Sequence, residues 1–135
     1  MYIGSSFGCR ATLKDKRILV VEDEALVSML VEDELRDAGA MVVGPAFCVD
    51  HAMRLIEAAP ADGGISAAVL DINLDGQHVE PVADRLAALG VPFMFATGYG
   101  EGRDTGGYGA APTLRKPYGM GSLIAAVAAL ASAEA

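Results

Sequence analysis

Acidic residues follow two short apolar runs of the sequence, and this arrangement points to one shared site. Residues 17–21 run into Glu22 and Asp23, and residues 67–70 run into Asp71. Short apolar runs bounded by turn residues are typical of strands that are buried on both faces of a parallel sheet. Because functional groups in such sheets gather in the crevice outside the carboxyl ends of the strands, we expect the three carboxylates to converge.

Two further strand ends supply a hydroxyl and an ammonium group. An apolar run over residues 92–96 ends at Thr97, and a short strand expected over residues 112–115 ends at Lys116. Clustered carboxylates with a backbone carbonyl nearby suit a hard divalent cation such as Mg²⁺. A carboxylate beside that cation and a lysine is a suitable nucleophile for an incoming phosphoryl group, because its oxygens are then neutralised and hydrogen-bonded. We therefore expect an aspartyl-phosphate to form on Asp71.

Five strands that alternate with helices are expected to position these groups. The strands are predicted over residues 17–21, 41–46, 67–71, 92–96 and 112–115, and the helices over about 25–38, 50–59, 79–89 and 120–131. This (βα)5 pattern predicts an α/β fold with a doubly wound, flavodoxin-like parallel five-stranded sheet and helices on both faces. Six of the fourteen residues from 98 to 111 are glycine, which predicts a fourth helix that is short or disordered.

Apolar periodicity predicts which face of each helix packs on the sheet. The expected inward residues are Leu26, Val27, Leu30, Val31, Leu35 and Ala38 in the first helix, Met53, Leu55 and Ile56 in the second, and Val79, Val82, Leu86 and Leu89 in the third. Asp50 is expected to cap the second helix. Glu80 and Asp84 are interpreted as a solvated helix face, and His51 and His78 as surface residues.

Composition limits the class of protein. With 135 residues the chain is long enough for one domain, and its net charge of −8 argues against a nucleic acid partner. Cys9 and Cys48 are too few for a disulfide framework and lack the spacing of zinc ligands. No apolar run has the length of a membrane span, and the N-terminus lacks a signal-peptide core, so we expect a soluble, cytoplasmic protein without membrane contact. Residues 1–15 show no periodicity and are expected to be a flexible N-terminal extension.

The order and separations of these motifs resemble those of a known family. The acidic pair Glu22-Asp23, the strand-end Asp71, Thr97 and Lys116-Pro117 are similar to the motifs of the receiver domain of bacterial two-component response regulators, with residues 16–135 as the receiver domain. The resemblance implies a single-domain regulator that takes a phosphoryl group from a histidine kinase or histidine phosphotransfer protein and acts through a downstream protein. It implies a signalling protein, monomeric or at most weakly dimeric, that catalyses only its own phosphorylation and dephosphorylation.

The resemblance also implies a role for each matching residue. Carried over position by position, these roles are phosphoacceptor for Asp71, direct Mg²⁺ ligand for Asp23, Mg²⁺ ligand through water for Glu22, backbone-carbonyl ligand for Asn73, and contacts to the phosphoryl group for Thr97 and Lys116. In this family the Lys-Pro bond after the last strand is typically cis, which suits a tight loop that aims a side chain.

A narrower resemblance concerns residues 92–100. Their sequence is similar to the Phe-Ala-Thr-Gly-x-Tyr type of receiver, many of which act alone in stress and phosphorelay signalling. Thr113 stands where most receivers place an aromatic switch residue, so a ring rotation on the last strand is not available. We expect the segment 98–111 to carry the signal instead, with Tyr99 and Tyr108 as the large side chains that could dock.

Two other classes use related chemistry. A Mg²⁺-dependent aspartyl-phosphate phosphohydrolase of the haloacid dehalogenase type needs a second acid two residues after its nucleophile, where this chain has Asn73, and a late acidic pair, which is missing between Lys116 and Glu134. A flavodoxin-like cofactor binder needs a Ser/Thr-rich phosphate loop after the first strand. This chain has Glu22-Asp23-Glu24 there, which would repel phosphate.

Overall fold

Alternating strands and helices build a three-layer α/β fold. The computed structural model describes residues 12–74, 76–97, 108, 111–115 and 120–133. The central parallel sheet has the strand order β2-β1-β3-β6-β7, with β1 (Arg17–Val21), β2 (Met41–Ala46), β3 (Ala67–Asp71), β6 (Phe93–Thr97) and β7 (Thr113–Arg115). The remaining elements are α2 (Ala25–Asp37), α3 (Val49–Ala58), the 3₁₀ helix η1 (Ala59–Asp62), the hairpin strands β4 (Asn73–Leu74) and β5 (Gln77–His78), α4 (Glu80–Ala88) and α5 (Met120–Ala133).

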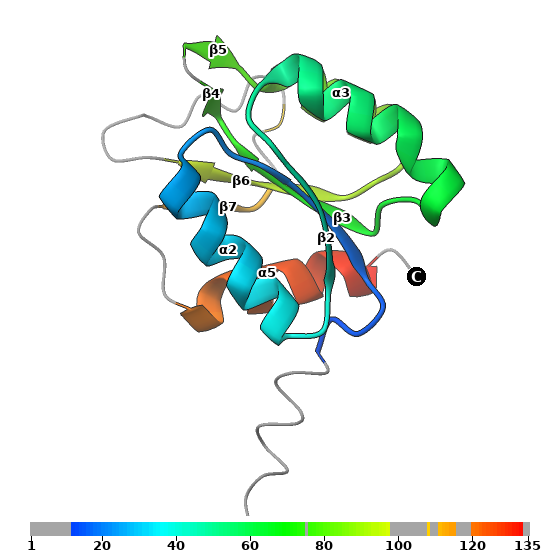
Figure 1. Cartoon of the computed structure of the whole chain (residues 1–135), viewed down its shortest axis with the longest axis vertical. Coiled ribbons are helices and arrows are strands. Elements are labelled where there is room, and N and C mark those ends of the chain that lie inside the picture. Colours follow the sequence, from blue (N-terminus) through cyan, green and yellow to red (C-terminus); the bar gives the residue numbers. More distant parts are fainter. Residues whose placement is uncertain (1–11, 75, 98–107, 109–110, 116–119, 134–135) are drawn as a thin grey trace, which may run out of the picture.

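The helices cover the two faces of the sheet in pairs. Figure 1 shows α2 and α5 together on one side and α3 on the other. The side chains of β1 alternate accordingly: Ile18 and Val20 pack with α2 and α5, whereas Leu19 and Val21 pack with α3 and α4. All five residues of β3 are buried. The doubly wound, flavodoxin-like parallel sheet predicted from the sequence is therefore confirmed.

An irregularity in the edge strand β2 supports the end of β1. Gly44 and Pro45, which are joined by a cis peptide, lie opposite the single residue Val20. Gly44 has φ +102°, and a Cβ atom there would lie 2.9 Å from the backbone nitrogen of Ala46 and 3.0 Å from the carbonyl oxygen of Val20. The shifted register lets the carbonyl of Ala46 accept a hydrogen bond of 2.9 Å from the backbone N–H of Glu22. Strand β2 thus holds the backbone at the point where β1 ends.

The buried face of α2 differs from the predicted one. Leu26 and Leu30, predicted to face inward, have 75% and 64% of their surface exposed, so that prediction is wrong. The buried residues of the helix are Ser28, Val31 and Leu35. The hydroxyl of Ser28 donates a hydrogen bond of 3.0 Å to the backbone carbonyl three residues earlier, which satisfies this polar group away from water. The helix therefore presents leucine side chains at the surface.

Two smaller predictions about α3 and α4 are also corrected. Cys48, not Asp50, is the N-cap of α3, and Asp50 lies in its first turn, where its carboxylate accepts a hydrogen bond of 3.1 Å from Arg54. Leu89, predicted to face inward, is the C-cap of α4 and is 49% exposed. Ala83, which was not predicted to face inward, is buried instead. Both errors concern residues at helix ends, where a helical period does not determine which side is buried.

The chain before β1 packs onto the fold earlier than predicted. Leu13 is fully buried, and its backbone N–H donates a hydrogen bond of 2.8 Å to the carbonyl of Ala38 at the end of α2. The boundary expected after residue 15 is thus too late, because Leu13 already belongs to the core. The segment 98–111, where the sequence predicts a fourth helix that is short or disordered, lies outside the described residues apart from Tyr108 and Ala111, and so does the Lys116–Pro117 bond. Across the described part of the chain, no helix has the length and apolar character needed to cross a membrane.

Candidate functional site

Three carboxylates converge at the carboxyl edge of the sheet, as the sequence predicted. Oxygen atoms of Glu22, Asp23 and Asp71 all lie within 4.8 Å of one another. Strands β1 and β3 are neighbours in the sheet, with Val21 paired to Leu70, so the residues that follow emerge side by side. Glu22 and Asp71 are each only 3% exposed, and Asp23 is half-buried. The cluster therefore lies at a position with limited access to water.

Backbone hydrogen bonds fix both strand ends that carry the cluster. Besides its bond to the edge strand β2, Glu22 accepts a hydrogen bond of 3.1 Å at Oε2 from the backbone N–H of Glu24. On the other side, the N–H of Ile72 donates a hydrogen bond of 3.2 Å to the carbonyl of Ala96 in β6. The carboxylates are thus presented by backbone that is held from the neighbouring strands.

A short hairpin follows Asp71 directly. In this hairpin Asn73 of β4 pairs with His78 of β5, and the N–H of Val79 donates a hydrogen bond of 3.0 Å to the carbonyl of Ile72. The Nδ1 atom of His78 accepts a hydrogen bond of 3.0 Å from the backbone N–H of Glu80, so this histidine supports the start of α4. The backbone of Asn73 is consequently placed in a closed loop, two residues beyond Asp71.

The other predicted site residues follow neighbouring strands. Thr97 is the last residue of β6, one position beyond Ala96, which pairs with Asp71. Thr97 also pairs with Arg115, the last residue of β7. Lys116 comes next in the sequence and lies outside the described residues, so its contact with the cluster stays a prediction.

The electrostatics of the cluster favour a bound cation. Three carboxylates whose oxygens lie within 4.8 Å of one another repel each other when all are ionised. Oxygen ligands from carboxylates, with a backbone carbonyl and water completing the shell, are the set that Mg²⁺ prefers. Glu22, Asp23 and Asp71 therefore fit a divalent metal by the chemistry of their donor atoms.

Comparison with known proteins places this arrangement in a family. No family model and no curated protein matches the sequence. Among solved structures, SdrG from Sphingomonas melonis Fr1 is 41% identical, with a TM-score of 0.75 over 86% of this chain and 96% of that one. A response regulator receiver protein from Sinorhizobium medicae WSM419 is 26% identical, with a TM-score of 0.72 over 91% of this chain and 99% of that one. The receiver domain of the response regulator PhyR from Erythrobacter litoralis is 25% identical, with a TM-score of 0.73 over 87% of this chain and 90% of that one.

The chain belongs to the response regulator receiver domains. The acidic cluster of this receiver occupies the strand ends at which the sequence motifs predicted it. The sequence did not reveal, however, which aromatic residue covers the sheet beside β7, and there the structure adds a contact between distant segments.

Tyr108 supplies that aromatic contact. Its ring lies edge-on to Phe93, with a centroid distance of 5.2 Å, and tilted against Phe95 at 6.5 Å. Its hydroxyl donates a hydrogen bond of 2.5 Å to Oδ1 of Asp84 on α4. This hydrogen bond, followed by burial and the negative charges of Asp84 and Glu80, raises the pKa of Tyr108. Asp84, interpreted from the sequence as part of a solvated face, therefore anchors a residue 24 positions away.

Thr113 takes no part in that aromatic cluster. It is exposed, it pairs with Phe95 in the sheet, and its hydroxyl donates a hydrogen bond of 3.4 Å to the carbonyl of Ala111. The ring that packs on Phe93 and Phe95 of β6 is that of Tyr108. The sequence contained one signal for this arrangement, namely that Tyr108 is among the few large side chains between β6 and β7.

Proposed function

We propose that this receiver accepts a phosphoryl group on Asp71 from the phosphohistidine of a histidine kinase or a histidine phosphotransfer protein. The observation that carries the proposal is the buried, strand-end Asp71 with the carboxylates of Glu22 and Asp23 within 4.8 Å. Membership of the receiver family supports the same reaction. The cytoplasm and a stress-response phosphorelay are the proposed setting, in line with the Phe-Ala-Thr-Gly motif that ends at Gly98.

The proposed reaction is a phosphoryl transfer between two side chains. A carboxylate oxygen of Asp71 forms a bond to phosphorus while the phosphorus–nitrogen bond of the phosphohistidine breaks, and the imidazole leaves with the bond's electron pair. Glu22, Asp23, Asp71 and the backbone carbonyl of Asn73 are the residues that would hold Mg²⁺. When bound, the cation supplies positive charge against the phosphoryl oxygens.

Two strand-end residues complete the proposed site. Thr97 would donate a hydrogen bond to a phosphoryl oxygen, and the ammonium of Lys116 would neutralise charge on the same group. Both roles rest on sequence position, since Thr97 is the last residue of β6 and Lys116 directly follows β7. Hydrolysis of the aspartyl-phosphate by water would return Asp71 to its starting state, so the protein signals through a covalent modification and has no dedicated substrate to turn over.

Phosphorylation with purified kinases tests this proposal. After incubation with candidate histidine kinases, ATP and Mg²⁺, the intact mass of the wild type should increase by one phosphoryl group. The Asp71→Asn variant should show no increase, since the amide is nearly isosteric with the carboxylate but is not a nucleophile. Asp62→Asn, at an exposed aspartate in η1, is the matched control and should be labelled like the wild type. Labelling of Asp71→Asn at the wild-type rate would overturn the assignment.

A hydrolase of the haloacid dehalogenase type remains the alternative function for a strand-end aspartate with Mg²⁺. Asn73 stands where such an enzyme needs its general acid, and an amide cannot donate that proton. The two functions differ in turnover. Sustained Mg²⁺-dependent hydrolysis of p-nitrophenyl phosphate, lost in Asp71→Asn, would favour the hydrolase over the receiver function.

A further inference from the structure

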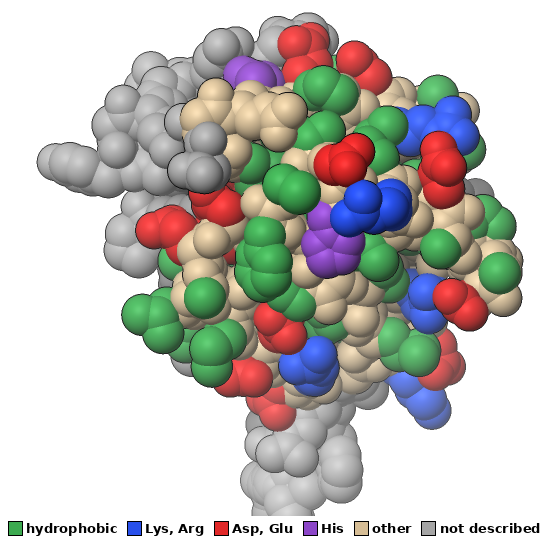
Figure 2. All heavy atoms as spheres, turned by 45° about the horizontal axis from the view of Figure 1, so that its top comes forward, with side chains coloured by type: hydrophobic (Ala, Val, Ile, Leu, Met, Phe, Trp, Pro, Cys, Tyr) green, Lys and Arg blue, Asp and Glu red, His purple; other side chains and the backbone are tan. Residues whose placement is uncertain are grey.

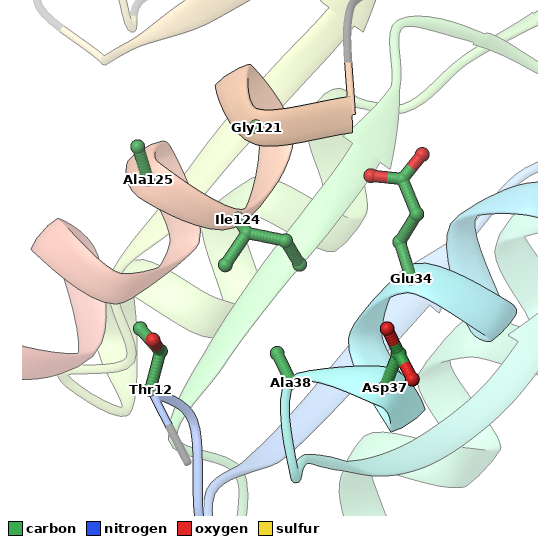
Figure 3. A pocket seen from close by; sticks show the side chains of 7 residues that line it. All are labelled: Thr12, Glu34, Asp37, Ala38, Gly121, Ile124 and Ala125. Atoms are coloured by element: carbon green, nitrogen blue, oxygen red, sulfur yellow. The ribbon is translucent and has the colours of Figure 1, made fainter. Parts of the chain in front are cut away.

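A cavity of about 450 Å³ lies between α2 and α5, away from the acidic cluster. Figure 3 shows its walls: two acidic side chains from α2, an apolar surface from α5, and the beginning of the described chain at one end. The described residues that line it are Thr12, Glu34, Asp37, Ala38, Gly121, Ile124 and Ala125. We call this cavity the α2–α5 groove.

The groove places the carboxylate of Glu34 beside apolar surroundings, with the exposed Asp37 next to it. Oε1 of Glu34 is buried and has no hydrogen-bond partner among the described residues. Burial raises the pKa of Glu34, since it disfavours the ionised carboxylate. Asp37 adds a second carboxylate one turn along the same face of α2. An occupant that combines positive charge, hydrogen-bond donors and an apolar stem would complement these walls.

The described residues around the groove do not supply that cation. Helix α5 contains no charged residue in its sequence from Met120 to Ala133. Arg36 on α2 pairs with Glu32, at 3.3 Å, and is not among the described lining residues. The acidic wall of the groove is therefore not neutralised by the described parts of α2 and α5.

The segment before Thr12 has the composition that the groove requires. Thr12 lines the groove, and the next residue, Leu13, is fixed by its burial and its hydrogen bond to the end of α2. Arg10 is the only lysine or arginine among the first eleven residues, and it stands two positions before Thr12. Two residues of extended chain span at most about 7 Å, so the guanidinium of Arg10 can reach the acidic wall. Phe7, three positions earlier, offers an aromatic ring for the apolar wall.

We propose that residues 1–11 of the same chain dock into the α2–α5 groove, with the guanidinium of Arg10 bridging the carboxylates of Glu34 and Asp37. The planar fork of donors on arginine suits two neighbouring carboxylates, and its methylene stem suits the apolar side of α5. Phe7 packs toward Ile124 and Ala125. Since Thr12 tethers the segment at the rim, its effective concentration at the groove favours it over the same segment of another copy.

A titration of Glu34 by NMR spectroscopy tests the ion pair. In Arg10→Gln the loss of the neighbouring charge should raise the pKa of Glu34 above its wild-type value and shift the methyl resonances of Ile124. Lys14→Gln is the matched control, because it removes one positive charge from an exposed residue close in sequence. It should leave both observables near their wild-type values. Equal effects of the two variants, or no effect of either, would overturn the proposal.

The two cysteines allow a test of where the segment lies. A nitroxide attached to Cys9 in a Cys48→Ser background should broaden the resonances of Ile124 and Ala125, and the added change Arg10→Gln should reduce this broadening. A nitroxide on Cys48, which is exposed at the start of α3, is the control in Cys9→Ser and should leave the groove unaffected. If Arg10→Gln left this broadening unchanged, the covalent link to Thr12 alone would explain why the nitroxide is near the groove, and the docked state would be overturned. Broadening between labelled and unlabelled copies in a mixed sample would assign the occupant to a second copy and contradict the intramolecular contact.

Discussion

The acidic cluster and the α2–α5 groove both gather carboxylates, but they build them from different parts of the fold. The cluster takes Glu22 and Asp23 from the end of β1 and Asp71 from the end of β3, and its oxygens converge within 4.8 Å. The groove takes Glu34 and Asp37 from one helix, one turn apart, and faces them with the apolar surface of α5. The carboxylates of the acidic cluster converge on one position from two strands, whereas those of the groove lie along one side of it.

This difference determines which cation each site suits. Carboxylates that converge from two strands can share a compact divalent ion, whose oxygen ligands must surround it. Carboxylates along one wall suit an extended cation with an apolar stem. Figure 2 shows acidic, basic and hydrophobic side chains intermingled on the face it presents, so negative charge alone does not mark a site on that face. The geometry of the carboxylates is the informative property.

The largest expected difference between the two sites is their response to Mg²⁺. Mg²⁺ at about ten times its Kd should stabilise the wild type by about 1.4 kcal/mol, because the ion binds the folded cluster and relieves its repulsion. For a domain of this size that corresponds to a rise in Tm of about 4 °C. Glu34→Gln should keep this rise, since Glu34 is not part of the acidic cluster. Thermal unfolding with and without Mg²⁺ measures both, and no rise at millimolar Mg²⁺ would contradict the metal site.

A difference of comparable size is expected within the acidic cluster. Asp23→Asn should weaken Mg²⁺ binding by about tenfold or more, about 1.4 kcal/mol, because we assign Asp23 a direct contact with the metal. Glu22→Gln should weaken it less, because Glu22 is assigned a contact through water. Calorimetric titration with Mg²⁺ measures both affinities, and phosphorylation rates should follow the same order. Equal losses in the two variants would refute the distinction.

The smallest expected effect concerns Asp84, a carboxylate outside both sites, whose partner is the phenol of Tyr108. Because the pKa of Tyr108 is raised in the fold, its stabilising contribution is fully present below the ordinary phenol pKa and is lost as pH rises through the folded value. The charged groups that act on it, Asp84 and Glu80, are both acidic and both on α4. Tyr108→Phe should therefore be less stable than the wild type near neutral pH, and the difference should narrow above about pH 10. Urea unfolding at both pH values measures this, and a difference independent of pH would exclude the phenol proton as its cause.

The sequence predicted the sheet and the acidic cluster because both follow from local patterns. Uninterrupted apolar runs before Glu22 and Asp71 fit strands buried on both faces, and parallel pairing then brings the ends of these strands together. The presence and type of the helices α2, α3 and α4 followed from apolar periodicity in the same way. These features depend on residue type and spacing alone.

Other features depend on tertiary contacts that no local pattern contains. The hydrophobic period of α2 favoured Leu26 and Leu30, but the structure buries Ser28, because its hydroxyl finds a partner within the helix. The hydrogen bond between Tyr108 and Asp84 joins segments 24 residues apart. The sequence around Asp84 has only the pattern of a solvated helix face, so it does not predict this bond. The acidic wall of the groove likewise arises only when α2 and α5 pack side by side. Such features required the structure.

The bulge at Gly44 has a consequence for mutational tolerance near the acidic cluster. Any side chain at this position would place a Cβ atom 2.9 Å from the backbone of Ala46 and 3.0 Å from that of Val20, in a backbone conformation that favours glycine. Ala46 in turn accepts the hydrogen bond that fixes Glu22. Gly44 contributes no side chain to the acidic cluster, yet its identity is constrained by the backbone that supports Glu22. In sequences that keep the same acidic cluster on this fold, variation at the edge strand should be narrowest at this glycine.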